Sequence, residues 1–234
     1  MADSNARDLY WNMPSNKDKA LMLAKKQLPD FVCDAINLEG INITVPEVQT
    51  LLEGITIGGH KIEDQQITLN QAYAWDKIFK WVKNDTFKLN KENILELHKI
   101  SAKEEALEWG SFRSGSVTIS GTDYMPPEAE KLPGLFEQMV TDSYSYKDVY
   151  DRAFFIFLTM ARNQFFYDVN KRMGRFAMNG LLLQEGFPAI NVPAKRKLEF
   201  NQLMIEFYEL GDLGPMNKFL RSCLDSRIIE IMLQ

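Results

Sequence analysis

Two apolar segments, at residues 148–161 and 174–184, constrain the fold more than any other feature of this sequence. The first is apolar on nearly every side and contains Phe154, Phe155 and Phe157. A helix that lacks a polar face has to be buried all round, so we expect both segments to form central helices. Other helices must then surround this pair, which predicts a mostly α-helical fold.

Apolar residues recur at helical spacing along most of the remaining chain. Further helices are predicted at residues 19–27, 46–54, 64–84, 91–107, 128–140, 195–210 and 214–233. Pro29 is expected to close the first of these, and residues 30–45 are interpreted as mixed structure with several β-branched side chains. The expected organisation is an N-terminal arm with a short helix at 1–44, a main domain at 45–224 and a C-terminal helical tail at 225–234.

The stretch at residues 110–121 differs from the rest, because glycine and serine surround short runs with β propensity. We predict a small β-hairpin there, with arms near 111–113 and 117–119. Pro126 and Pro127 are expected to end it.

Composition excludes several classes of function. The 27 basic and 32 acidic side chains give a net charge of −5, which argues against a broad nucleic-acid surface. No apolar run is long enough to cross a membrane, and the N-terminus lacks the apolar core of a signal peptide. The two histidines, His60 and His98, rule out a multi-histidine metal site, and we expect His98 at the edge of the core. Cys33 and Cys223 are expected to be reduced thiols of a cytoplasmic protein.

Polar side chains are concentrated between the two apolar helices, at residues 163–175. A core rejects such groups unless they line a pocket. The stretch leads into a helix, whose first turn offers unpaired N–H groups and a positive dipole end to an anion. Lys171, Arg172 and Arg175 add phosphate-binding donors, and Asp168 is an oxygen ligand of the kind that Mg²⁺ prefers. A site for phosphate and magnesium and an ordinary polar connection between helices both remain open at this point.

Residues 164–175 read Gln-Phe-Phe-Tyr-Asp-Val-Asn-Lys-Arg-Met-Gly-Arg. This stretch resembles the motif of the Fic (filamentation induced by cAMP) family, His-x-Phe-x-Asp/Glu-Gly-Asn-Gly/Lys-Arg-x-x-Arg. The positions that match are Phe166, Asp168, Asn170, Lys171, Arg172 and Arg175. Residues 111–127 resemble the flap hairpin of that family, and the resemblance extends over residues 45–224.

The resemblance implies a Fic-type helical bundle that transfers AMP from ATP to a hydroxyl side chain of a target protein, with magnesium. Asp168 then corresponds to the magnesium ligand, and Phe166 to the residue that anchors the loop in the core. The nucleotide would be held by Asn170, Lys171, Arg172, Gly174 and Arg175. The flap between Ser111 and Ile119 would hold the target segment in an extended form.

An inhibitory glutamate is also implied by the resemblance. Leu52-Glu53-Gly54-Ile55 resembles the family's inhibitory-helix signature, Ser/Thr-x-x-x-Glu-Gly, although Gln49 stands where the signature has Ser or Thr. Glu53 would then pair with Arg175 and block the place of the γ-phosphate.

The motif departs from the family at two positions that bear on catalysis. Gln164 stands in place of the histidine that acts as general base, and an amide cannot accept a proton near neutral pH. Such positioned acid–base catalysis is typically worth about 10²–10⁴-fold. Val169 stands in place of glycine, and a β-branched residue is strained at positive φ.

Three functions therefore stay open: an AMP transferase whose activity is weakened or altered, a nucleotide-binding pseudoenzyme, and an interaction module such as one half of a toxin–antitoxin pair. The intact set of acidic and basic motif residues disfavours the third. Neither nucleic acid nor a membrane is an expected partner, and the sequence does not decide whether the chain forms a homo-oligomer.

Overall fold

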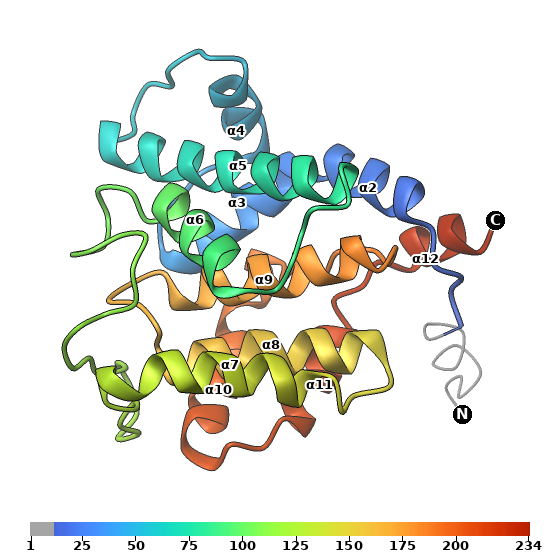
Figure 1. Cartoon of the computed structure of the whole chain (residues 1–234). Coiled ribbons are helices and arrows are strands. Elements are labelled where there is room, and N and C mark those ends of the chain that lie inside the picture. The colour runs from blue at the N-terminus through green and yellow to red at the C-terminus, as the bar shows by residue number, and fades with distance from the viewer. Residues whose placement is uncertain (1–11) are drawn as a thin grey trace.

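The computed structural model describes residues 12–234, and this part of the chain contains eleven α-helices and no strand. The helices are α2 (Lys17–Lys26), α3 (Leu28–Glu39), α4 (Val45–Leu52), α5 (Ile62–Lys83), α6 (Lys91–Ser101), α7 (Leu132–Ser143), α8 (Val149–Asn163), α9 (Asn170–Gln184), α10 (Lys197–Leu210), α11 (Gly214–Arg221) and α12 (Ser226–Leu233). Two 3₁₀ turns, Ala129–Lys131 and Ala194–Arg196, lead into α7 and α10. The prediction of a mostly α fold is confirmed (Figure 1).

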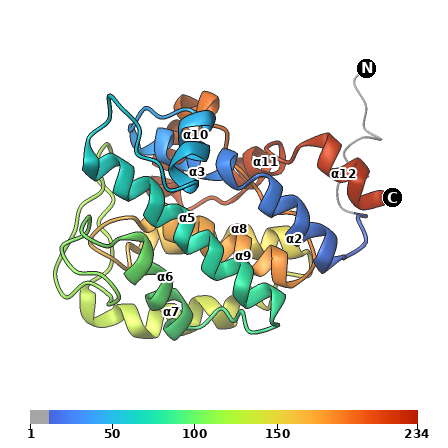
Figure 2. The ribbon, with the colours of Figure 1, turned by 90° about the horizontal axis from the view of Figure 1, so that it is seen from above.

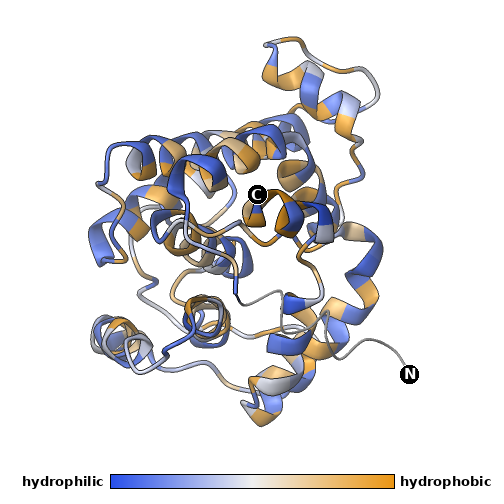
Figure 3. Cartoon of the chain, turned by 90° about the vertical axis from the view of Figure 1, so that its right-hand side faces the viewer, coloured by the Kyte–Doolittle hydropathy of each residue, from blue (hydrophilic) through white to orange (hydrophobic). Residues whose placement is uncertain are grey.

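The two apolar segments form the centre of the molecule, as their sequences predict. Helix α9 lies between α5 and α6 on one side and α8 on the other (Figure 1). Every residue of α9 except Lys171 and Gln184 is buried. The outer helices carry both polar and apolar residues, which Figure 3 shows as alternating blue and orange bands. Within residues 12–234, none of the helices combines the length and the apolar character that a membrane span needs.

Helix α9 begins at Asn170, earlier than the predicted start at Gly174, so Gly174 lies inside the helix. A Cβ at Gly174 would lie 2.8 Å from the carbonyl oxygen of Phe157 in α8, closer than real Cβ contacts allow. Gly174 therefore faces α8 and lets the two central helices approach each other. The structure shows a packing role for Gly174, and its predicted part in the nucleotide site stays a prediction.

The flap is a loop and not the predicted β-hairpin. Residues 110–128 contain no strand, and those at 114–127 make no backbone–backbone hydrogen bond to any described residue. The side chain of Arg113 instead donates hydrogen bonds to the carbonyl groups of Gly115 and Pro127. Short arms rich in glycine and serine pair weakly, so one buried guanidinium determines the course of the segment.

The N-terminal region contains two packed helices where the sequence predicts an arm, a short helix and mixed structure. Pro29 lies in the first turn of α3, where proline is tolerated, and so begins a helix instead of ending one. Phe31, Val32 and Ile36 bury the inner face of α3. The part of the predicted arm at residues 1–11 lies outside the described residues.

The two ends of the described chain meet on one side of the molecule (Figure 2). Helix α12 contacts α2, and Lys19 Nζ donates to the carbonyl of Ile231 at 3.2 Å. The predicted C-terminal tail at 225–234 is thus a helix docked on the N-terminal helix.

We expect Gly174→Ala to destabilise the protein, because the added methyl group collides with backbone and cannot be relieved by one rotamer. Overpacking of this kind costs about 1–3 kcal/mol, against which a helical alanine recovers only about 1 kcal/mol. Gly134→Ala in α7 is the matched control, since a Cβ there meets nothing within 4 Å. Thermal unfolding should show a lower Tm for the first variant and an equal or higher Tm for the second. Equal Tm values would contradict the packing role of Gly174.

Candidate nucleotide site

A cleft of about 390 Å³ opens at the N-terminal end of α9. The end of α8, the loop after it, the start of α9, the flap and α10 line this cleft. Its residues are Glu39, Thr118, Ile119, Ser120, Gln164, Tyr167, Asp168, Val169, Asn170, Lys171, Asn201, Met204, Ile205 and Tyr208. Of the predicted site residues, Gln164, Asp168, Asn170 and Lys171 are brought together here, whereas Arg172, Gly174 and Arg175 lie behind the cleft wall.

Left-handed backbone marks both ends of the loop between α8 and α9. Gln164 caps α8 with φ of 49°, and Val169 caps the start of α9 with φ of 58°. Such values are strained for valine, and strain of about 1–3 kcal/mol persists only where the surroundings hold it. The expected conflict at Val169 is real, and the loop keeps the conformation despite it.

Asn170 closes this loop with its side chain. Its Nδ2 donates to the carbonyl of Phe166 at 2.8 Å and to Gln164 Oε1 at 2.9 Å, and its Oδ1 accepts from the Phe166 amide at 2.9 Å. The side chain is buried and fully occupied. Anion binding at this helix end would thus fall to the backbone N–H groups of the first turn of α9, which have no partner within the helix.

Gln164 is fixed at both ends of its amide group. Its Nε2 donates to the carbonyl of Ala161 at 2.5 Å, and its Oε1 accepts from Asn170. The side chain lines the cleft. It offers hydrogen bonds to a hydroxyl group, and no basic atom.

Asp168 presents an exposed carboxylate in the cleft. Its Oδ1 accepts from the amide of Val169 at 2.6 Å, which orients the group. Residues 12–234 contain no cluster of three or more His, Cys, Asp or Glu side chains that could hold a metal ion. Mg²⁺ is commonly bound by one or two carboxylates together with substrate phosphates, so this single carboxylate fits a metal that arrives with a nucleotide.

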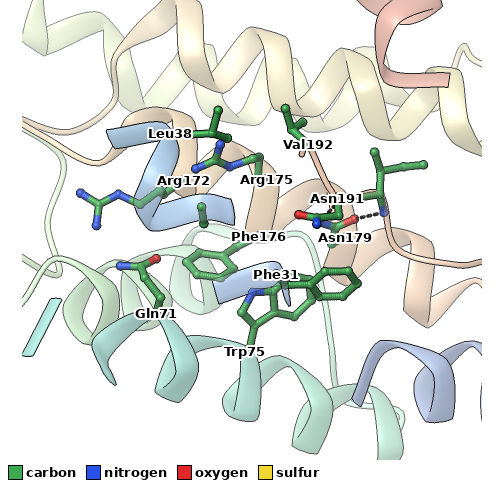
Figure 4. A pocket seen from close by; sticks show the side chains of 12 residues that line it. Phe31, Leu38, Gln71, Trp75, Arg172, Arg175, Phe176, Asn179, Asn191 and Val192 are labelled. Atoms are coloured by element: carbon green, nitrogen blue, oxygen red, sulfur yellow. Dashed lines mark hydrogen bonds between the residues drawn. The ribbon is translucent and has the colours of Figure 1, made fainter. Parts of the chain in front are cut away.

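Glu39, at the end of α3, is the carboxylate beside Arg175. Arg175 Nη2 lies 3.5 Å from Glu39 Oε1, and Lys171 Nζ lies 3.8 Å from Glu39 Oε2. Burial raises the pKa of Glu39, but the charges of Lys171 and Arg175 outweigh it and the net pKa is lowered. The carboxylate is thus held in its charged form. Arg175 itself is buried, and Figure 4 shows its side chain next to Leu38 of α3.

Glu53, the predicted partner of Arg175, lies elsewhere. It is exposed at the C-cap of α4, whereas the ion pair with Arg175 is made by Glu39. The tetrapeptide Leu-Glu-Gly-Ile occurs twice, at residues 38–41 and 52–55, and neither copy is preceded by the Ser or Thr of the signature. The sequence therefore contains a signal for Glu39, and only the fold distinguishes the two copies.

Arg172 pairs with Glu105, whereas Arg175 pairs with Glu39. Both terminal nitrogens of Arg172 donate to Glu105, with Nη1 at 2.9 Å from Oε2, and its side chain is only 3% exposed. Glu105 precedes the flap, so this pair ties the flap segment to α9. Two buried donors, Arg172 Nε and Arg175 Nη1, have no partner among the described residues. Both arginines line a cavity of about 20 Å³, roughly the space of one water molecule (Figure 4).

His98 packs against the loop between α8 and α9. It is fully buried, and its ring stacks on Phe166 with the centroids 3.7 Å apart. Its Nδ1 accepts from the amide of Gly110 at 3.1 Å. Burial lowers the pKa of His98 to about 4, so the ring is neutral at pH 7. Phe166 is fully buried.

Helix α10 supplies a wall of the cleft that the motif did not reveal. Met204 and Tyr208 are buried on its inner face, and Asn201 and Ile205 stand beside them. Their helical spacing marks an apolar face, but nothing in the sequence indicates which helix that face meets.

A family model described as "Fic/DOC family" matches residues 88–182. Among curated proteins, a protein adenylyltransferase Fic from Drosophila willistoni is 24% identical over 221 residues, which are 90% of this chain and 43% of that protein. The corresponding protein of Drosophila persimilis is 23% identical over 219 residues, 89% of this chain and 42% of the relative. The chain thus spans less than half the length of these relatives.

Two solved structures share the fold. Fic-1 (residues 134–508) from C. elegans has a TM-score of 0.80 at 18% identity, with 96% of this chain and 68% of that chain covered. A Fic domain containing signaling protein from Bacteroides thetaiotaomicron has a TM-score of 0.76 at 19% identity, with 98% and 95% covered.

The buried His98 predicts a loss of stability in acid. The unfolded chain takes up a proton at His98 below about pH 6.5, the ordinary value. The folded protein does so only near pH 4. Stability is therefore lost as the pH falls between these values, by up to about 3 kcal/mol through this residue. Urea unfolding between pH 7 and pH 4 should show this slope in the wild type and a smaller one in His98→Gln; parallel curves would contradict the assignment.

Proposed function

We propose that this chain, whose residues 88–182 match the Fic/DOC family model, binds ATP with magnesium for AMP transfer to a hydroxyl side chain of a target protein. The observation that carries this proposal is the cleft at the start of α9, where Asp168 and Lys171 lie beside the Glu39–Arg175 ion pair. The curated relatives are named protein adenylyltransferase, which supports the same reaction.

The cleft offers suitable contacts to each part of the nucleotide. The unpaired N–H groups at the start of α9 suit phosphate oxygens, and Lys171 and Arg175 suit the terminal phosphate. Asp168 would hold the magnesium ion, which supplies charge neutralisation of the phosphates when bound. The apolar side chains of α10 suit a nucleobase. The orphaned Nη1 of Arg175 is a buried donor still available to an anion that displaces Glu39.

Glu39 acts as an inhibitory group in this proposal, the role that the sequence alone suggested for Glu53. Its carboxylate occupies two cations that a γ-phosphate would need. A nucleotide must therefore displace Glu39 or bind with its terminal phosphate elsewhere. Displacement exchanges one anionic partner of Arg175 for another, because guanidinium groups bind carboxylate and phosphate in the same manner.

The transfer step requires the target hydroxyl oxygen to attack the α-phosphorus while the bond to the leaving pyrophosphate breaks. The hydroxyl proton has to go to a base, and Gln164 cannot accept it. We therefore propose an activity reduced by the missing base, in which positioning and charge carry what remains of the rate. The alternative is a pseudoenzyme that binds ATP without transfer, which the two engaged ends of the Gln164 amide favour.

The remaining features of the proposal concern the target and its location. The flap at residues 111–119 would hold an extended target segment, since Thr118 and Ile119 line the cleft and their backbone groups are unpaired within the described chain. A cytoplasmic location is supported by two free cysteines, Cys33 and Cys223. Formation of a homo-oligomer stays a prediction to be tested.

We expect Glu39→Gly to bind ATP and magnesium at least about tenfold more tightly than the wild type, because a competing carboxylate is removed from two cations. The same variant should unfold at lower temperature without nucleotide, since Arg175 loses its buried partner, and ATP should restore much of the loss.

Glu53→Gly is the matched control, because it makes the same change in the second copy of the same tetrapeptide. Calorimetric titration with ATP and magnesium should find wild-type affinity for this variant. Equal affinities of all three proteins would mean that Glu39 does not compete with the nucleotide. No measurable ATP binding by any of them would contradict the proposed function itself.

Introducing the missing base should raise transfer. In the Glu39→Gly background, Gln164→His should increase AMP transfer from labelled ATP by about 10²–10⁴-fold, the range of general-base catalysis. Histidine tolerates the left-handed backbone at this position better than most residues. Gln164→Ala is the control that removes the amide without adding a base. The opposite result is efficient AMP transfer by the Glu39→Gly protein with its native Gln164, and lower transfer after Gln164→His. That result would show that glutamine serves an altered chemistry.

A further inference from the structure

We propose that Arg113 is a positioning residue that holds the flap and the loop at Gln164 as one rigid unit. The target segment on the flap and the reacting end of the nucleotide would then be presented in a fixed register. This inference rests on the proposed function and deepens it, because it names the group that couples target binding to the catalytic loop.

The side chain of Arg113 joins three segments that are separate in the sequence. Its Nε donates to the carbonyl of Gln164 at 2.6 Å, and its Nη1 donates to the carbonyl of Gly115 at 2.6 Å. Its Nη2 donates to the carbonyl of Pro127, at the far end of the flap. The backbone amide of Arg113 also donates to the carbonyl of Phe165 at 3.0 Å. One residue therefore closes the flap and fixes it to the loop.

The environment of Arg113 makes this arrangement specific to a guanidinium group. The residue is only 3% exposed, and its side-chain partners are carbonyl groups with no carboxylate among them. Burial lowers the pKa of Arg113, so its charge is costly to bury without such dipoles. The planar fork of arginine reaches separated acceptors at once, whereas an ammonium group is a point charge.

The flap depends on the hydrogen bonds from Arg113 because it contains no regular secondary structure. Residues 114–127 make no backbone–backbone hydrogen bond to another described residue. Apart from the carbonyls of Gly115 and Pro127 and the amide of Tyr124, their backbone groups are available to an extended segment, but a free edge is mobile unless it is tied at its ends. Arg113 supplies both ties, at Gly115 and at Pro127, and attaches them to Gln164.

Two other contacts keep the flap against the loop and agree with the proposed coupling. Ser114 Oγ lies 3.1 Å from the hydroxyl of Tyr167, and a Cβ at Gly115 would lie 2.9 Å from the same hydroxyl. At the flap root, His98 accepts from Gly110 and stacks on Phe166. Arg113 is the only one of these groups that also reaches the backbone of Gln164.

Hydrogen exchange of the whole chain without nucleotide tests the coupling directly. In Arg113→Gln, the hydrogen-bonded amides of the flap, at residue 113 and Tyr124, and those of the loop, at Phe166 and Val169, should all exchange at least about tenfold faster, because both segments lose the guanidinium that holds them. Arg113→Lys keeps the charge and should restore only part of the protection. Arg152→Lys is the matched control, an arginine that donates to Ser143 Oγ away from the cleft. Faster exchange in the flap alone, or in neither segment, would overturn the proposal.

A kinetic comparison separates positioning from a merely structural role. In the Glu39→Gly, Gln164→His background, Arg113→Lys should lower kcat for AMP transfer by at least about tenfold and leave KM for ATP within about threefold. An equal fold-change in kcat and in KM for ATP would contradict a positioning role of Arg113. If Arg113→Gln does not fold by circular dichroism, Arg113→Lys alone decides both experiments. The exchange result needs no ATP, so a failure to bind nucleotide would contradict the proposed function and leave this test intact.

Discussion

Two arginines buried on the central helix determine where the rest of the site lies. Arg172 and Arg175 of α9 are buried, and each has its own carboxylate. Removing one partner of such a pair costs about 3–5 kcal/mol, because a bare charge stays buried. The pairs therefore fix two distant segments at the end of α9: α3 through Glu39, and the chain before the flap through Glu105. The cleft is the space left between the segments that these ion pairs bring together.

Most of the fold follows from apolar spacing, and the differences from prediction have identifiable causes. The apolar segments at 148–161 and 174–184 predict the central place of α8 and α9, which the structure confirms. Proline occurs near either end of a helix, and only the apolar face of α3 shows that Pro29 begins one. Glycine and β propensity predict a hairpin in the flap, but local sequence does not reveal that a single side chain, Arg113, replaces strand pairing.

The sequence predicts which residues line the candidate site, but not which contacts their side chains make. The motif places Gln164, Asp168 and Lys171 in one cleft, because they follow each other on a short loop. It does not separate the roles of Arg172 and Arg175, since residues three apart on a helix share a face but can reach different neighbours. The pairing of Glu39 with Arg175 is not predictable from the sequence, because the tetrapeptide Leu-Glu-Gly-Ile occurs twice. Tertiary charge decides between the copies: Lys171 and Arg175 stand opposite the first.

The loop between α8 and α9 is held in a strained conformation by the side chains around it. Left-handed backbone at Gln164 and Val169 costs free energy, and the structure offsets it with the Asn170 clamp, the stacked His98 and the hydrogen bond from Arg113. A chain that had kept only the fold would gain stability by relaxing these residues, since strained backbone persists where surroundings hold it. The groups to which the proposal assigns binding and orientation are therefore held in place, while Gln164 provides no proton acceptor at the position of the motif histidine. Because positioning and proton transfer contribute separately to a rate, the absence of one leaves the other in place, and the proposed binding of a nucleotide does not depend on a base at residue 164.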